Sequence, residues 1–201
     1  MIKAIAFDLG GVLFTEGKSV AYEKMKEDLG YDIEKIKYIL TSSMSVDLRK
    51  GLIIDEDFWS WANRQLPEGY DTELIKKYWY DGYLLDDDVY RLAQKLKGKY
   101  KLLIFSGNIK SRIEYLKNRY HFRNLFDIEV YSYDYHYNKP QKEFLEVMIK
   151  QAGVKPEEIV YIDDSSHDIR FAQELGINAI IYEKEKIQKL KKKLSTLGVS
   201  F

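Results

Sequence analysis

The polar residues of this 201-residue chain that could do chemistry stand at the ends of short apolar runs. Asp8 follows the run IKAIAF, Ser106 follows KLLIF, and Asp163 with Asp164 ends IVYIDD. Lys139 stands just before a proline, at the expected start of a helix. If the apolar runs are strands of one parallel sheet, their carboxyl ends share one edge, so these side chains converge there.

Converging carboxylates indicate a metal site. Three of them repel one another and lose hydration unless a cation joins them, and carboxylate oxygens with water suit Mg²⁺. We therefore predict that Asp8, Asp163 and Asp164 bind Mg²⁺. Such a site can hold a phosphoryl group, because the metal and Lys139 neutralise its oxygens, Ser106 donates a hydrogen bond, and one aspartate can attack phosphorus.

The elements that must position these residues follow a regular alternation. Apolar runs of strand length occupy residues 2–7, 101–105, 127–131, 159–163 and 178–182. From residue 86 onward they alternate with amphipathic segments of helix length at 86–99, 108–120, 140–153 and 166–176. This alternation predicts an α/β fold with a doubly wound parallel sheet.

One long segment interrupts the alternation. Between Asp8 and Asp86, about 75 residues show helical periodicity at 19–30, 32–43, 55–66 and 72–83 but no strand pattern, and this is too long for a loop. We predict an α-helical cap subdomain at 15–85, inserted into a core formed by 1–14 and 86–201. Its expected place is over the carboxyl edge of the sheet, where ligands of such folds bind.

The amino-acid composition limits the kinds of molecule that the protein is expected to bind. Lys and Arg together number 32, as do Asp and Glu, so the formal charge is zero and nothing favours nucleic acid. The chain has no cysteine, which excludes disulfides and thiol nucleophiles. No apolar run has the length of about 18 residues that a membrane span needs. We expect a cytoplasmic monomer or homodimer that acts on a small molecule and binds neither nucleic acid nor membrane.

Four motifs strengthen this interpretation. FDLGGVLF, IFSGN, SYDYHYNKP and YIDDSSHDIRFAQELGI resemble, in this order and spacing, the four signatures of the haloacid dehalogenase-like (HAD) hydrolase superfamily. The helical insertion is similar to the cap of its phosphatase branch. The resemblance implies a Rossmann-like core in which the first strand is central and the second and fourth strands lie beside it.

The resemblance also implies roles for single residues. Asp8 would be the nucleophile that forms an aspartyl-phosphate, and Ser106 would hold the phosphoryl oxygens. Lys139 would bridge Asp8 and the phosphate, while Asp164 would bind Mg²⁺ directly and Asp163 at longer range. The neighbouring loop positions implied to contact substrate are Gly10, Gly11, Gly107 and Asn108.

Gly10 departs from the family pattern, because most phosphatases of the family have a second aspartate there. Its backbone carbonyl can still bind the metal, as the family implies, but it has no side chain to protonate the leaving group. General acid–base help is worth about 10²- to 10⁴-fold in rate. Glu16, His136 and Asp168 are candidates to replace the missing acid.

Three functions stay open from the sequence. The first is a Mg²⁺-dependent phosphatase of a small phosphorylated metabolite, with sugar phosphates as one class. The second is a 2-haloacid dehalogenase that uses Asp8 without metal, because a halide leaves without a proton. The third is a weakened enzyme that binds a phosphorylated ligand or a protein partner. Arg49 and Lys50, in the insertion, are candidates to contact a second anionic group.

Overall fold

A single parallel sheet organises the molecule. The computed structural model describes all 201 residues and has five strands in the order β3-β2-β1-β4-β5. The doubly wound parallel sheet and the central position of the first strand are therefore confirmed. The strands are β1 (Ala4–Phe7), β2 (Lys101–Ser106), β3 (Ile128–Tyr131), β4 (Ile159–Asp163) and β5 (Asn178–Ile181).

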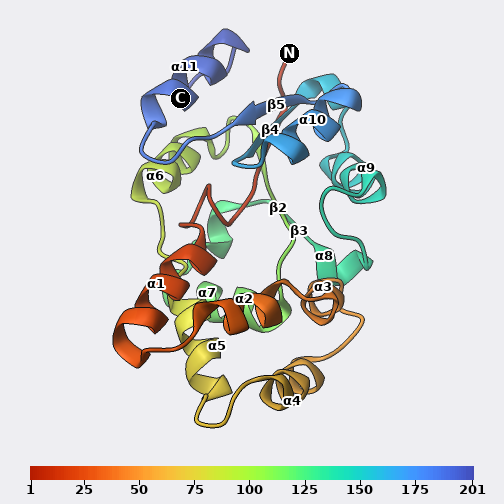
Figure 1. Cartoon of the computed structure of the whole chain (residues 1–201). Helices are drawn as coiled ribbons and strands as arrows, with labels where there is room; N and C mark the ends of the chain where they lie inside the picture. The colour runs from red at the N-terminus through yellow and green to blue at the C-terminus, as the bar shows by residue number, and fades with distance from the viewer.

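Helices cover both faces of the sheet because its strands are apolar on both sides. In β1, Ala4 and Ala6 belong to a buried cluster with residues of α9 and α10, whereas Ile5 and Phe7 belong to a cluster with residues of α6, α7 and α11. Figure 1 shows these layers around the strands. The covering helices are α6 (Asp87–Leu96), α7 (Lys110–Tyr120), α9 (Lys142–Ala152), α10 (Ser166–Glu174) and α11 (Ile187–Thr196).

The chain between β1 and α6 is helical and contains no strand. Figure 1 shows its helices grouped at the end of the molecule opposite the N-terminus, beyond the carboxyl ends of the strands. These helices are α1 (Gly17–Leu29), α2 (Ile33–Thr41), α3 (Ser43–Arg49), α4 (Asp55–Gln65) and α5 (Thr72–Asp81).

Two linkers join this helical group to the sheet, and they run side by side. Phe14 and Leu85 form an antiparallel bridge. The backbone N of Thr15 donates to the Leu84 carbonyl (2.8 Å), and the Thr15 hydroxyl donates to the Gly82 carbonyl (2.6 Å). The two crossings of the chain are thus hydrogen-bonded to each other.

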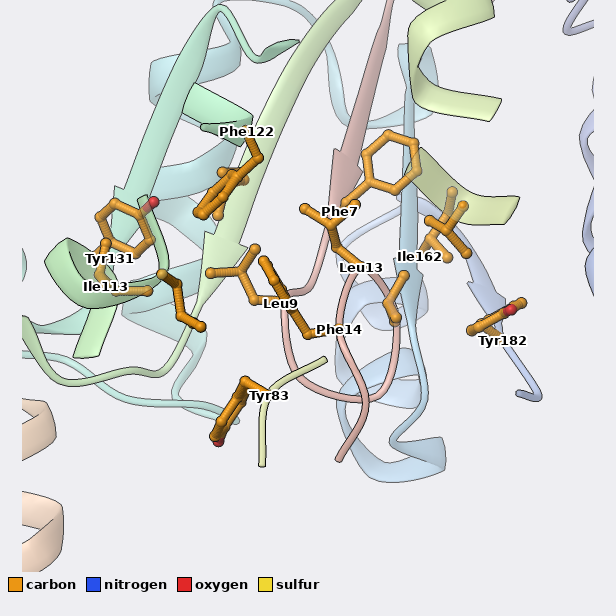
Figure 2. Packing of buried hydrophobic residues seen from close by; sticks show 14 of the residues in the cluster. Phe7, Leu9, Leu13, Phe14, Tyr83, Ile113, Phe122, Tyr131, Ile162 and Tyr182 are labelled. Atoms are coloured by element: carbon orange, nitrogen blue, oxygen red, sulfur yellow. The ribbon is translucent and has the colours of Figure 1, made fainter. Parts of the chain in front are cut away.

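Apolar packing is continuous across these linkers. One cluster of 41 buried residues includes Phe7 on the sheet, Phe14 in the first linker, Tyr83 in the second and Trp79 in α5. Figure 2 shows Leu9 and Phe14 between the strands and Tyr83. The helical group and the sheet therefore share one hydrophobic core.

Three short elements complete the fold. The strand predicted at 127–131 is confirmed as β3, which ends at Tyr131, and α8 (Ser132–Tyr135) turns the chain at once. Two 3₁₀ turns, η1 (Phe122–Leu125) and η2 (Pro156–Glu158), precede β3 and β4.

Candidate active site

Asp8 lies at the carboxyl edge of the sheet, immediately after the central strand β1. Its backbone N donates to the Ile162 carbonyl of β4 (2.9 Å), which continues the strand pairing as far as this residue. Ser106 ends the neighbouring strand β2, and Asp163 ends β4 on the other side. The strand order therefore brings Ser106, Asp8 and Asp163 to one edge, as expected for parallel neighbours.

Lys139 joins two of the aspartates. Its Nζ lies 2.9 Å from Oδ1 of Asp8 and 2.6 Å from Oδ2 of Asp163. The side chain of Asp163 is only 1% exposed, and it also accepts hydrogen bonds from the Tyr161 hydroxyl and from the backbone N of Ser165 (2.7 Å). A buried carboxylate is stable only with such partners, so these contacts fix Asp163 behind Asp8.

The charged groups in this cluster shift one another's pKa values. Burial, together with the nearby Asp163, raises the pKa of Asp8 to about 7, although Lys139 opposes the shift. Partial burial of its carboxyl group and the neighbouring Asp163 raise the pKa of Asp164 to about 6. Burial alone would lower the pKa of Lys139, but Asp163 and Asp8 hold it above its usual range. Without a further cation, the edge carries an excess of negative charge at neutral pH.

The donor set fits a hard divalent cation. Carboxylate oxygens of Asp8, Asp163 and Asp164 all lie within 4.8 Å of one another. Oxygen ligands of this type suit Mg²⁺, which also retains several water ligands. The raised pKa values of Asp8 and Asp164 agree with this assignment, because the single positive charge of Lys139 does not offset burial and the charge of Asp163 at either group.

Two glycines allow the backbone to pass close to this cluster. Gly11 has φ of 76°, and a Cβ at this position would lie 1.9 Å from Oδ2 of Asp164. At Gly107 a Cβ would lie 2.4 Å from Oδ1 of Asn138. Gly10 differs, because a Cβ there would meet only the Tyr83 ring, at 3.5 Å from Cε1. The side chain of Tyr83 thus lies where a longer residue at Gly10 would extend.

A network of polar side chains fixes the β2–α7 loop. Ser106 and Asn108 are both 2% exposed, and Asn108 Nδ2 lies 3.4 Å from Ser106 Oγ. The amide oxygen of Asn108 accepts from its neighbour Ile109 N (3.0 Å) and from Arg112 Nε (2.8 Å). The backbone N of Asn108 donates to Ser132 Oγ (3.0 Å). The loop is therefore held before any substrate binds.

A cavity of about 230 Å³ opens in front of Asp8. Eight residues that the sequence indicates as candidates line it: Asp8, Gly10, Glu16, Arg49, Ser106, Gly107, Asn108 and Asp164. Lys139 and Asp163 do not line it but support Asp8 from within the fold.

The three candidate acids lie in different places. Glu16 lines the cavity, and its carboxylate accepts from the backbone N of Ser19 (3.1 Å) as the cap of α1. His136 is exposed, and its Nδ1 lies 2.8 Å from the Lys50 carbonyl. Asp168 lies on the Lys139 side, in a crevice with Tyr161. Only Glu16 among the three faces the cavity.

Arg49 lines the cavity as well, whereas Lys50 does not. The structure adds three lining residues that the sequence analysis missed: Lys18, Tyr83 and Arg112. Arg112 had a signal, because it lies on the apolar side of α7 with Ile113 and Leu116, where an arginine is unusual. Lys18 and Tyr83 stand beside the linkers, and no pattern in the surrounding sequence indicates that they belong to the site.

The doubly wound sheet, with a lysine and three aspartates at its carboxyl edge, defines a Rossmann-like α/β enzyme. A family model of haloacid dehalogenase-like hydrolases matches residues 2–176, so the chain belongs to the HAD-like hydrolase family.

Relatives in sequence cover the chain to different extents. An uncharacterised protein of Dictyostelium discoideum is 40% identical and aligns over 98% of this chain and 97% of its own length. A sesquiterpene phosphatase of Aspergillus oryzae is 27% identical over 87% of both chains. A pyrophosphatase of Bacillus cereus is 29% identical over 56% of this chain and 49% of its own length.

Solved structures share the fold. A HAD family enzyme of Bacteroides thetaiotaomicron, in complex with magnesium and inorganic phosphate, has a TM-score of 0.79 at 24% identity and covers 92% of this chain and 96% of its own. An L-2-haloacid dehalogenase of Xanthobacter autotrophicus has a TM-score of 0.68 at 18% identity, covering 100% of this chain and 85% of its own. None of the helices in the structure combines the length and apolar character needed to span a membrane.

Proposed function

We propose that this hydrolase is a Mg²⁺-dependent phosphatase of a small phosphorylated metabolite and that Asp8 is its nucleophile. The observation that carries the proposal is the cluster in which Lys139 joins Asp8 to Asp163 while Asp164 completes a set of carboxylate oxygens within 4.8 Å. A dehalogenation site needs no such metal ligands. The relatives named as phosphatases and the neighbour crystallised with magnesium and phosphate support the same choice.

In this proposal Asp8, Asp164, the Gly10 carbonyl and, at longer range, Asp163 hold Mg²⁺, which when bound neutralises charge on the phosphoryl oxygens. Lys139 favours the ionised form of Asp8 and orients its carboxylate, because its ammonium lies 2.9 Å from Asp8 Oδ1. Ser106 donates its hydroxyl proton in a hydrogen bond to a phosphoryl oxygen.

The proposed reaction has two steps. An oxygen of Asp8 attacks phosphorus, a new P–O bond forms, and the bond from phosphorus to the leaving oxygen breaks as that oxygen takes up a proton. A water molecule then attacks the phosphorus of the aspartyl-phosphate, and the bond from phosphorus to the Asp8 oxygen breaks. The proton of the water passes to the group that protonated the leaving oxygen in the first step, which restores that acid. This releases inorganic phosphate and restores the Asp8 carboxylate.

The proton of the first step needs a donor because Gly10 has no side chain. We assign it to Glu16, the candidate acid that lines the cavity. Residues 15–85 are proposed as the cap, because α3 and the linkers supply Arg49, Lys18 and Tyr83 to the same cavity.

The test is phosphate release from a panel of phosphorylated metabolites, p-nitrophenyl phosphate and acetyl phosphate, with Mg²⁺ or with EDTA. Wild-type protein should release phosphate only with Mg²⁺, and Asp8→Asn should abolish release while the far-UV circular dichroism stays unchanged. Full activity in Asp8→Asn would refute the nucleophile assignment.

The dehalogenase hypothesis is tested in parallel with 2-chloropropionate. Chloride release without metal, together with no phosphate release from the whole panel, would replace the phosphatase proposal. If neither product forms, binding of phosphorylated ligands without turnover becomes the better hypothesis.

A further inference from the structure

Two buried arginines face the cavity in front of Asp8. Arg49 ends α3 of the helical group and is 8% exposed, and Arg112 lies in α7 of the sheet domain and is 1% exposed. Both line the cavity, as does the ammonium-bearing Lys18. Buried arginines are rare unless a carboxylate or another anion pairs with them.

Neither guanidinium has an acidic partner in this structure, since no ion pair involves Arg49 or Arg112. Arg49 Nη1 donates only to Ser45, at 3.2 Å to the carbonyl and 2.9 Å to Oγ. Arg112 Nε donates to Asn108 Oδ1 (2.8 Å). Arg49 Nη2 and Arg112 Nη1 are buried and make no hydrogen bond. Unpaired buried donors are destabilising, the more so when charged, and a bound anion would offset this cost.

The surrounding side chains hold both groups in place. The Arg112 guanidinium lies 4.5 Å from the Trp79 ring and 4.4 Å from the Tyr83 ring, and the Arg49 guanidinium lies 5.8 Å from Trp79. Aromatic faces attract cations and restrict how a planar guanidinium can turn. The free N–H groups are therefore pre-oriented before a ligand arrives.

A buried serine connects the two arginines through the backbone. Ser132 Oγ donates to the Arg49 carbonyl (2.6 Å) and accepts from the Asn108 backbone N (3.0 Å). Asn108 in turn binds Arg112 through its side chain. Ser132 and Asn108 thus link the guanidinium supplied by the helical group to the guanidinium supplied by α7, on the sheet side.

The positive charges of these side chains also lower one another's pKa values. Burial, and then the charges of Arg49 and Arg112, lower the pKa of Lys18 to about 8. Burial and the charge of Arg112 lower the pKa of Arg49 to about 10. Glu16 opposes the shift only at Lys18, so these neighbouring positive charges still favour the binding of an anion.

The transferred phosphoryl group already has its own partners. The proposed function gives it Ser106, Lys139 and the metal at the Asp8 side of the cavity, whereas Arg49 enters from α3 and Arg112 from α7. Guanidinium groups bind phosphoryl oxygens in a bidentate manner. The two arginines and Lys18 therefore supply charge and donors for a second phosphoryl group.

We propose that Arg49, Arg112 and Lys18 form a second anion subsite, and that the substrate is a small metabolite with two phosphoryl groups. One group would lie at Asp8 and the other between the arginines. This inference rests on the proposed function, because it assumes that the first phosphoryl group is placed at Asp8.

The first measurement is calorimetric binding of methylenediphosphonate, a diphosphate analogue that is not hydrolysed, compared with inorganic phosphate, both with Mg²⁺. Arg49→Gln and Arg112→Gln should each weaken diphosphonate binding at least tenfold more than they weaken phosphate binding. Arg64→Gln is the matched control, because Arg64 is an exposed arginine of α4 that contacts only Ser60. It should change neither affinity.

The second measurement is the ratio of kcat/KM for glucose 1,6-bisphosphate to that for glucose 6-phosphate. Wild type should favour the bisphosphate, and the arginine variants should lose that preference. If Arg112→Gln does not fold, as judged by circular dichroism, Arg49→Gln and Lys18→Gln decide the question.

Equal losses for diphosphonate and phosphate, or for both sugar substrates, would overturn the inference, since the arginines would then serve the transferred group. Unchanged diphosphonate binding in the variants would overturn it as well. Failure of the proposed function is recognised separately. In that case arginine-dependent diphosphonate binding persists while phosphate release is absent or unaffected by Asp8→Asn.

Discussion

At the scale of single residues, Gly10 raises the main question about the proposed reaction, because it has no side chain that could protonate the leaving group. A Cβ at Gly10 would meet Tyr83 Cε1 at 3.5 Å, so the aromatic ring partly fills the space of the missing side chain. Glu16 reaches the same cavity from the start of α1. The need for an acid depends on the leaving group, which makes the assignment testable.

We expect Glu16→Gln to lower the turnover of alkyl phosphates by about 10²- to 10⁴-fold, the usual value of general acid–base catalysis. The turnover of p-nitrophenyl phosphate should fall much less, because its leaving group departs without a proton. Steady-state kinetics on both substrates checks this. His136→Gln is the control, because His136 is exposed and outside the cavity. Equal losses on both substrates in Glu16→Gln would argue against an acid role.

The pKa values of the carboxyl cluster predict how metal binding depends on pH. Asp8 and Asp164 titrate near 7 and 6 in the folded protein, above their ordinary 3.8. Between pH 4 and 7 the metal-free folded state therefore binds more protons than the unfolded state, and its stability falls as the pH rises. At the proposed metal site, protons would compete with Mg²⁺ for the same oxygens in this range.

Saturating Mg²⁺ should accordingly raise the melting temperature more at pH 8 than at pH 5, as measured by differential scanning fluorimetry with EDTA as reference. Asp164→Asn should reduce the shift at pH 8. A shift that is equal at both pH values would show that the bound metal does not compete with protons at Asp8 and Asp164.

At the scale of elements, the start of α1 is tightly packed against Tyr83. A Cβ at Gly17 would lie 2.1 Å from Cδ2 of Tyr83, which is 6% exposed and stacks against Arg112. Tyr83 must move if any side chain is added there. Gly10 approaches the other side of the same ring at an ordinary contact distance.

Gly17→Ala should therefore lower the free energy of unfolding by about 1–3 kcal/mol, the usual cost of overpacking a core. Gly10→Ala should change it by less than about 0.5 kcal/mol, as surface-like substitutions do. Urea unfolding of both variants provides the comparison. Equal destabilisation by the two substitutions would contradict the packing described for Tyr83.

The sequence predicted the strands well and the helical insertion less completely. All five strands coincide with predicted apolar runs within a few residues, because strands buried on both faces need continuous apolar side chains. α3 was not predicted, since Ser43–Arg49 is one short helix of seven residues with polar side chains on most positions. Its stability depends on contacts with α2, α4 and α8, which local sequence does not encode.

At the scale of the whole molecule, the shared core predicts cooperative unfolding. All three tryptophans, Trp59, Trp61 and Trp79, lie in α4 and α5, so their fluorescence reports the helical group. Far-UV circular dichroism reports the whole chain. Because one cluster of 41 buried residues joins both parts, the two signals should follow one transition in urea. Separate midpoints would show that the helical group unfolds independently.

The candidate site illustrates what a sequence can and cannot reveal at this scale. Asp8, Ser106 and Asp163 were predictable, because each ends a strand and parallel strands share a carboxyl edge. Arg112 and Tyr83 were not, because their meeting depends on how the helical group docks on the sheet. Docking depends on tertiary packing, which cannot be predicted from the spacing of residues along the chain.

The paired linkers limit how the two parts can move. Thr15 and Leu84 are hydrogen-bonded, and Phe14 bridges Leu85, so both crossings must turn together. Two independent tethers would permit twisting and sliding, whereas a hydrogen-bonded pair would confine any relative motion of the two parts mainly to a rotation about the line of the linkers. Arg49 belongs to the helical group, in α3, and Arg112 to the part that contains the sheet, in α7. An anion bound by both arginines would oppose that rotation and hold the two parts together.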